Sequence, residues 1–141
     1  MKTWAMMYGM IWVAFFQIII VLFPVAGEWP ADIVHAGLGV ILLFMSYGIN
    51  KQVRATTCPA RVKRIVGATF RFCIFQAVLG VVLFTFLLES VGGVELEFVQ
   101  FLHVAVAITI ITQASSSATA YDMWEEKEFA VPTEPSEKAS T

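Results

Sequence analysis

The chain has 141 residues, of which 58% are apolar and only 14% are charged, and its mean hydropathy is +0.76. Soluble domains are nearer half apolar and a quarter charged, and a domain this small cannot cover so much apolar surface in water. The composition excludes a water-soluble globule and a disordered chain. The net charge of −2 gives no reason to expect a nucleic acid as partner. We therefore expect one domain whose solvent is a lipid bilayer.

Four apolar stretches are each long enough to cross a membrane, whose ~30 Å hydrocarbon core requires roughly 20 helical residues. Only helices or closed barrels satisfy their backbone in lipid, and these stretches lack the alternating pattern of barrel strands. The sequence thus predicts an all-α membrane protein with transmembrane helices at about 6–26, 31–49, 65–88 and 98–120. Their short connections favour an up-down-up-down four-helix bundle.

The basic residues predict the orientation of this bundle. Those between the second and third spans are Lys51, Arg54, Arg61, Lys63 and Arg64, whereas the other two connections contain no Lys or Arg. Because basic loops stay in the cytoplasm, we expect a multi-pass protein of the cell membrane with both termini cytoplasmic. In this interpretation residues 1–121 form the transmembrane domain, and 122–141 form an acidic cytoplasmic tail that starts as a short helical end.

The two histidines of the chain, His35 and His103, lie inside the second and fourth spans. Each follows the outer end of its span by about five residues, or roughly 8 Å along a helix axis, and both spans run in the same direction. The second and fourth helices of an up-down bundle are diagonal neighbours. We therefore expect the two imidazoles to face each other across the core at one depth.

The sequence around the histidines repeats. Residues 32–39 and 100–107 both read polar, apolar, apolar, His, any, small, apolar, small. The preceding spans also echo each other, with Phe-Gln at 16–17 and at 75–76, each followed by an apolar run. This pattern indicates two related helical hairpins, a parallel internal repeat about an axis along the membrane normal.

Such a pair of histidines favours haem ligation. A haem is a flat apolar disc that needs an axial nitrogen on each side, small residues where it passes the backbone, and apolar walls. One turn outward from each histidine lies Asp32 or Gln100, placed to orient the imidazole or meet a propionate, and one turn inward lies Gly39 or Ala107. Gly37 and Gly80 are further candidates to leave space for the haem ring. Its apolar surroundings would come from Phe15, Phe72, Phe75, Phe101 and the methionines.

Simpler explanations stay open at this point. A lone intramembrane histidine often only hydrogen-bonds between helices, and small residues in membrane helices are commonly packing residues. Zinc or copper fits less well, because two imidazoles leave either ion short of ligands and no Cys or Glu lies at the same level. Arg71, about one and a half turns into the third span, should snorkel toward the inner headgroups or contact a substrate or partner.

At these residues the sequence resembles the haem A synthase family, whose members are built from four-helix units with paired haem-ligating histidines. The matching segments are 32–39, 71–80 and 99–103, in the family's order and spacing. Asp32 stands where the family has Glu, and Ala36 stands where it usually has Arg. The resemblance implies a b-type haem (haem b) between His35 and His103 as the metal ligands, and it makes Asp32 the candidate catalytic carboxylate.

Other family features are missing. Most members have eight helices in two halves, and many bacterial members carry paired cysteines in an outer loop. This chain has one four-helix unit, and Cys58 and Cys73 lie on its predicted cytoplasmic side. We expect a reduced thiol at Cys58 and a small apolar filler at Cys73. Because oxidation of a haem methyl group needs both a substrate haem and an electron-transfer haem, a homodimer would have to supply two pockets.

Two functions from different classes follow. One is a haem-binding redox protein, either a haem A synthase-like oxidoreductase or an electron-transfer protein. The alternative is a non-catalytic accessory subunit of a larger membrane oxidase or monooxygenase complex. A transporter fits less well, because no span has the interrupted-helix pattern typical of a substrate site.

Overall fold

The structure, a computed structural model, describes residues 2–22, 29–88 and 93–128. This part of the chain forms four helices: α1 (Thr3–Leu22), α2 (Trp29–Arg54), α3 (Ala60–Leu88) and α4 (Val94–Glu128). All four are long and apolar enough to cross a membrane. The expected all-helical class with four apolar helices is thus confirmed.

The helices extend beyond the predicted spans because helical structure continues through the polar residues that flank them. The longest extension is at α4, which runs from Val94 to Glu128 and whose last residues are the short helical end expected at the start of the tail. At ~1.5 Å per residue α4 is roughly 50 Å long, well beyond the thickness of a hydrocarbon core. Residues 23–26 of the first predicted span and 129–141 of the tail lie outside the described residues.

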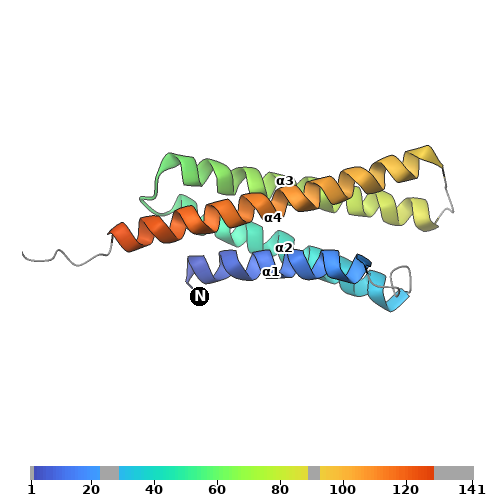
Figure 1. The fold of residues 1–141 in the computed structure, drawn as a ribbon, viewed down its shortest axis with the longest axis horizontal. Helices are drawn as coiled ribbons and strands as arrows, with labels where there is room; N and C mark the ends of the chain where they lie inside the picture. Colours follow the sequence, from blue (N-terminus) through green and yellow to red (C-terminus); the bar gives the residue numbers. More distant parts are fainter. Residues whose placement is uncertain (1, 23–28, 89–92, 129–141) are drawn as a thin grey trace, which may run out of the picture.

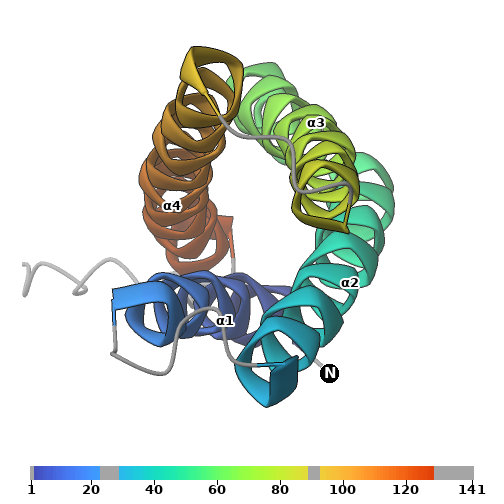
Figure 2. The ribbon, with the colours of Figure 1, turned by 90° about the vertical axis from the view of Figure 1, so that its right-hand side faces the viewer.

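The four helices lie side by side along one axis (Figure 1). Viewed from one end they form a ring in the order α1, α2, α3, α4 (Figure 2). Each helix packs against two others: α1 and α3 both contact α2 and α4. Within the described ranges α2 and α4 do not pack against each other directly, so the two helices that carry histidines lie on a diagonal of the ring.

Polar contacts show which parts of α1 and α2 meet. The Thr3 hydroxyl, at the start of α1, donates to Gln52 Oε1 near the end of α2 at 3.0 Å. Gln17 Nε2, near the end of α1, donates to the backbone oxygen of His35 near the start of α2 at 3.5 Å. We call the end where α2 turns into α3 the basic end, and the opposite end, at the right in Figure 1, the histidine end.

Buried apolar side chains from all four helices make one core, which is concentrated toward the basic end. Met7, Val53 and Ile110 are its largest fully buried side chains. Cys58 and Cys73 are buried free thiols in the same core, so Cys73 is the apolar filler that its sequence context favours. Toward the histidine end fewer side chains are buried: none of 30–41 or 93–105 is, whereas Gln17 of α1 and Gln76 and Leu79 of α3 are.

Large apolar side chains face outward around the bundle. Phe44, Phe84 and Phe101 are each more than half exposed. An outer surface with aromatic and aliphatic side chains on every helix is unsuited to water and suited to contact with acyl chains. The distribution of side chains thus agrees with the composition, which points to a bilayer as solvent.

The core makes a direct prediction about stability. Replacing the buried Ile110 by Ala should lower the free energy of unfolding by about 2–4 kcal/mol, because the substitution leaves a cavity. Ile108→Ala on the same helix is the matched control, since Ile108 is 55% exposed against 1% for Ile110. Denaturant titration in micelles, followed by circular dichroism, measures both changes. Equal losses in the two variants would show that the helix faces are assigned wrongly.

Candidate functional site

His35 on α2 and His103 on α4 meet inside the bundle. Their ring centroids are 6.2 Å apart and the ring planes are inclined by 49°. Both side chains are half-buried. Because α2 and α4 do not pack directly, the two imidazoles reach across the diagonal. The structure therefore brings together the two histidines that the sequence analysis singled out, at one level of the bundle.

Three buried polar side-chain atoms at described positions have no hydrogen-bond partner. They are Nδ1 of His35, Nδ1 of His103 and Oε1 of Gln76. A buried polar atom without a partner costs about 1–3 kcal/mol, so native proteins keep few of them. Two of the three atoms belong to the facing imidazoles. The Nε2 atoms, through which imidazoles usually bind a haem iron, are not among the three.

The spacing of the rings can be tested against ligation of a metal ion. Bonds from an imidazole nitrogen to a metal are about 2 Å long, so two rings on opposite sides of one ion have centroids roughly 6 Å apart. The observed 6.2 Å agrees with this value. Within 2–22, 29–88 and 93–128, no group of three or more His, Cys, Asp or Glu residues is placed to hold an ion. A haem iron fits a pair of axial imidazoles, since its porphyrin supplies the equatorial nitrogens.

Glycines give the site its close contacts. A Cβ at Gly80 of α3 would lie 3.5 Å from Cε1 of His103, so this imidazole rests directly against the α3 backbone. A Cβ at Gly39 would lie 3.4 Å from Nε2 of Gln17, the amide that donates to the His35 backbone. Gly39 therefore makes room for a glutamine rather than for an imidazole. Ala107, one turn after His103, is half-buried.

Gln17 and Gln76 are functional candidates to which the sequence analysis gave no role. Both are buried, with 9% of their surface exposed, and they occupy equivalent positions on α1 and α3. The signal was present in the repeated Phe-Gln pair. An amide in an otherwise apolar span is costly to bury, so its repetition in both halves indicated a shared purpose.

Several predicted wall residues face away from the histidines. Gly37 has no atom within 4 Å of the position its Cβ would take. It follows His35 by two residues, which is roughly 200° around a helix. The phenylalanines that point outward are Phe15, Phe75 and Phe101. The prediction that these four residues surround the space between the imidazoles is therefore wrong, whereas Phe72 is partly buried and packs against the core.

The polar residues one turn from the histidines do not contact them. Asp32 and Gln100 are both exposed, and the structure gives neither side chain a hydrogen bond to an imidazole. The expectation that they orient the rings is thus not met in this structure. Contact of either side chain with a haem propionate, and the catalytic role of Asp32, stay predictions.

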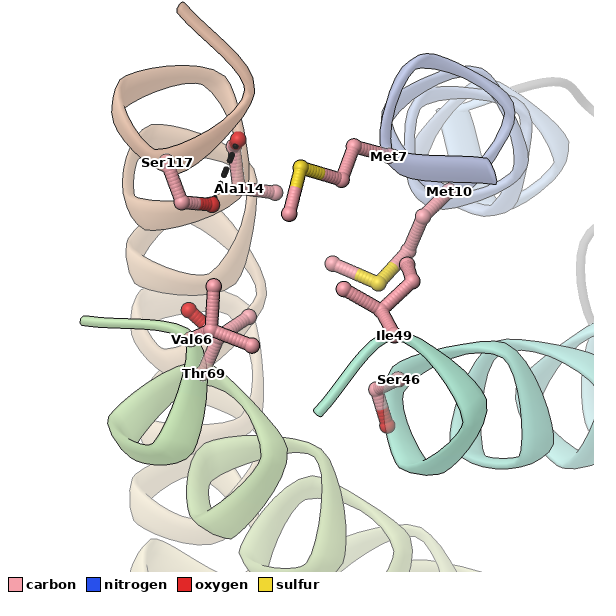
Figure 3. Close-up of a pocket in the computed structure, with 8 residues that line it drawn as sticks. All are labelled: Met7, Met10, Ser46, Ile49, Val66, Thr69, Ala114 and Ser117. Atoms are coloured by element: carbon pink, nitrogen blue, oxygen red, sulfur yellow. Dashed lines mark hydrogen bonds between the residues drawn. The ribbon is translucent and has the colours of Figure 1, made fainter. Parts of the chain in front are cut away.

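A small cavity lies deeper in the core, toward the basic end (Figure 3). It encloses about 10 Å³, room for about one water molecule. Its lining comes from all four helices: Met7, Met10, Ser46, Ile49, Val66, Thr69, Ala114 and Ser117. The hydroxyls in it already donate to backbone carbonyls of their own helices, as Ser117 does to Ala114 in Figure 3. We assign this cavity to packing.

Comparison of the chain with protein-family models, with curated proteins and with solved structures found no match. The resemblance to haem A synthases therefore rests on the residues quoted above.

The contact between Gly80 and His103 can be tested by substitution. Gly80→Leu should displace the His103 ring, and overpacking of this kind costs about 1–3 kcal/mol of unfolding free energy. Gly37→Leu is the matched control, because it brings the same gain in helix propensity at a position with open space. Thermal unfolding in detergent should give a lower midpoint for Gly80→Leu than for Gly37→Leu. Equal midpoints would place His103 away from α3.

Proposed function

We propose that this chain is an integral membrane protein that holds one b-type haem between His35 and His103. The observation that carries the proposal is the 6.2 Å separation of the imidazole centroids of His35 and His103, which come from helices on a diagonal of the bundle. We propose an electron-transfer role or a haem A synthase-like oxidation for the protein.

The proposal includes a membrane topology. The four apolar helices form an up-down-up-down bundle with the hairpins α1–α2 and α3–α4 as two repeats. The contacts of Thr3 with Gln52 and of Gln17 with the His35 backbone support this arrangement. The basic residues of the α2–α3 turn support a cytoplasmic position for that turn and for both termini. The histidines then lie toward the non-cytoplasmic side of the cell membrane.

Each residue near the two histidines has its own role in the proposed site. A bound haem supplies one-electron redox chemistry. His35 of α2 and His103 of α4 would hold the haem, and Gly80 leaves room for the His103 ring against α3. Gln17 fixes the start of α2 through the His35 carbonyl. Asp32, exposed one turn from His35, is the carboxylate available for proton transfer in a haem A synthase-like reaction.

A reaction that needs two haems would require a second copy of this chain, since the described helices bring together one pair of histidines. An electron-transfer role requires no second copy. The two versions of the proposal therefore differ in oligomeric state as well as in chemistry, and a change in cellular haem composition is expected for the oxidation alone.

A second candidate function is a non-catalytic accessory subunit of a larger membrane oxidase or monooxygenase. The observation that favours it is an exposed aromatic ridge on α1. The Trp12 ring lies 6.0 Å from Phe15 and 6.3 Å from Phe16, and all three side chains face outward. Aromatic side chains of this kind are enriched in the cores of protein interfaces.

Haem binding predicts a spectrum and its loss. Protein purified from haem-replete cells should show a Soret band and a sharp α-band on reduction. His35→Ala and His103→Ala should each lower the haem-to-protein ratio about tenfold or more, because each removes an axial ligand. Thr112→Ala, an exposed position on α4, should leave the ratio unchanged. A colourless wild-type protein that copurifies with larger subunits would favour the accessory role instead.

The topology predicts which cysteines react from outside the cell. In a Cys58→Ala, Cys73→Ala background, Glu95→Cys at the histidine end should react with a membrane-impermeant maleimide in intact cells. Thr57→Cys in the α2–α3 turn should react only after the membrane is opened. Both native side chains are exposed, so access depends on the side of the membrane. The opposite labelling pattern would invert the proposed orientation.

A further inference from the structure

The outer face of α3 carries a line of arginines. Arg61, Arg64 and Arg71 are all exposed, and their spacing of three and seven residues places them on one side of the helix. Arg61 and Arg64 lie near the basic end. Arg71 lies roughly 16 Å along the axis from the first residue of α3, in an otherwise apolar stretch. A charge at such a position is costly in lipid unless it finds a partner.

Arg71 adjoins a depression in the surface of the bundle. The depression has a volume of about 350 Å³ and is lined by Arg71, Ala68, Phe72 and Phe75. Nε of Arg71 donates to the Gly67 backbone oxygen at 3.3 Å. Among the described residues this is the one hydrogen bond of the Arg71 guanidinium, and no carboxylate forms an ion pair with it. The two terminal nitrogens are thus available to an outside acceptor.

We propose that this face of α3 binds an anionic membrane phospholipid, with its phosphate held by Arg64 and Arg71 and an acyl chain over Phe72 and Phe75. A guanidinium presents a planar fork of donors that matches a phosphate in two parallel hydrogen bonds. Arg64 and Arg71 are two turns apart, about 10 Å along the helix axis. Both side chains are long enough to reach one phosphate that lies between them.

The order of side chains along the face favours a lipid over other anions. Charged groups come first, at Arg61, Arg64 and Arg71, and exposed apolar side chains follow at Phe75 and Val78. This sequence of charge and then apolar surface matches a headgroup followed by an acyl chain. A soluble anion would use the arginines alone. The site lies on the outside of α3, while His103 contacts α3 through Gly80, so the inference is independent of haem binding.

The test measures bound lipid per chain by native mass spectrometry. The full-length protein is stripped of lipid and exposed to micelles with equal amounts of phosphatidylglycerol and phosphatidylcholine. Wild-type protein should retain phosphatidylglycerol preferentially. Arg71→Gln should reduce that retention about fivefold or more, because the two-pronged phosphate contact is lost. Phe75→Ala should also reduce it. Arg54→Gln is the matched control, an exposed arginine of α2 that bonds to Asn50.

Two further arms make the result decisive. Arg71→Lys keeps the charge without the planar fork, so it should retain an intermediate amount and serves if Arg71→Gln fails to fold. Millimolar inorganic phosphate should not displace the lipid from wild-type protein. Equal retention by wild type and Arg71→Gln, no preference between the two lipids, or full displacement by phosphate would each overturn the proposal.

Discussion

Two imidazoles, from the second and fourth helices, approach each other across the diagonal of the bundle. His35 and His103 come from helices that do not pack against each other, so α1 and α3 must hold these helices at the separation that keeps the rings 6.2 Å apart. Gly80 is the point at which α3 supports His103. A haem bound by both imidazoles would link α2 and α4, which do not otherwise pack against each other.

The two ends of the bundle differ in how many side chains are buried. The basic end carries the closely packed core, with Met7, Val53 and Ile110 fully buried. The histidine end has few buried side chains, and its polar groups include two glutamines in equivalent positions, Gln17 and Gln76. The packed half therefore holds the four helices in register, while few side chains are buried at the other end.

Much of this fold could be predicted from the sequence, because four long apolar stretches indicate four helices and their short connections place the second and fourth on a diagonal. The histidine pair follows from that order and from the repeat. The faces of the spans are harder to read. Gly37, Phe15 and Phe101 point away from the site. Hydropathy could not predict this, because the outward and the core-facing sides of these helices are equally apolar. The continuation of α4 to Glu128 agrees with the short helical end that the sequence predicts after the fourth span.

Electron paramagnetic resonance of the oxidised protein tests the central claim most directly, because the signal reports the axial ligands of a ferric haem. The account predicts a low-spin signal typical of two imidazoles, at one haem per chain. It predicts conversion to a high-spin signal, or loss of the iron, when either His35 or His103 is replaced. A wild-type protein without iron, or one whose signal is unchanged in both variants, would contradict it.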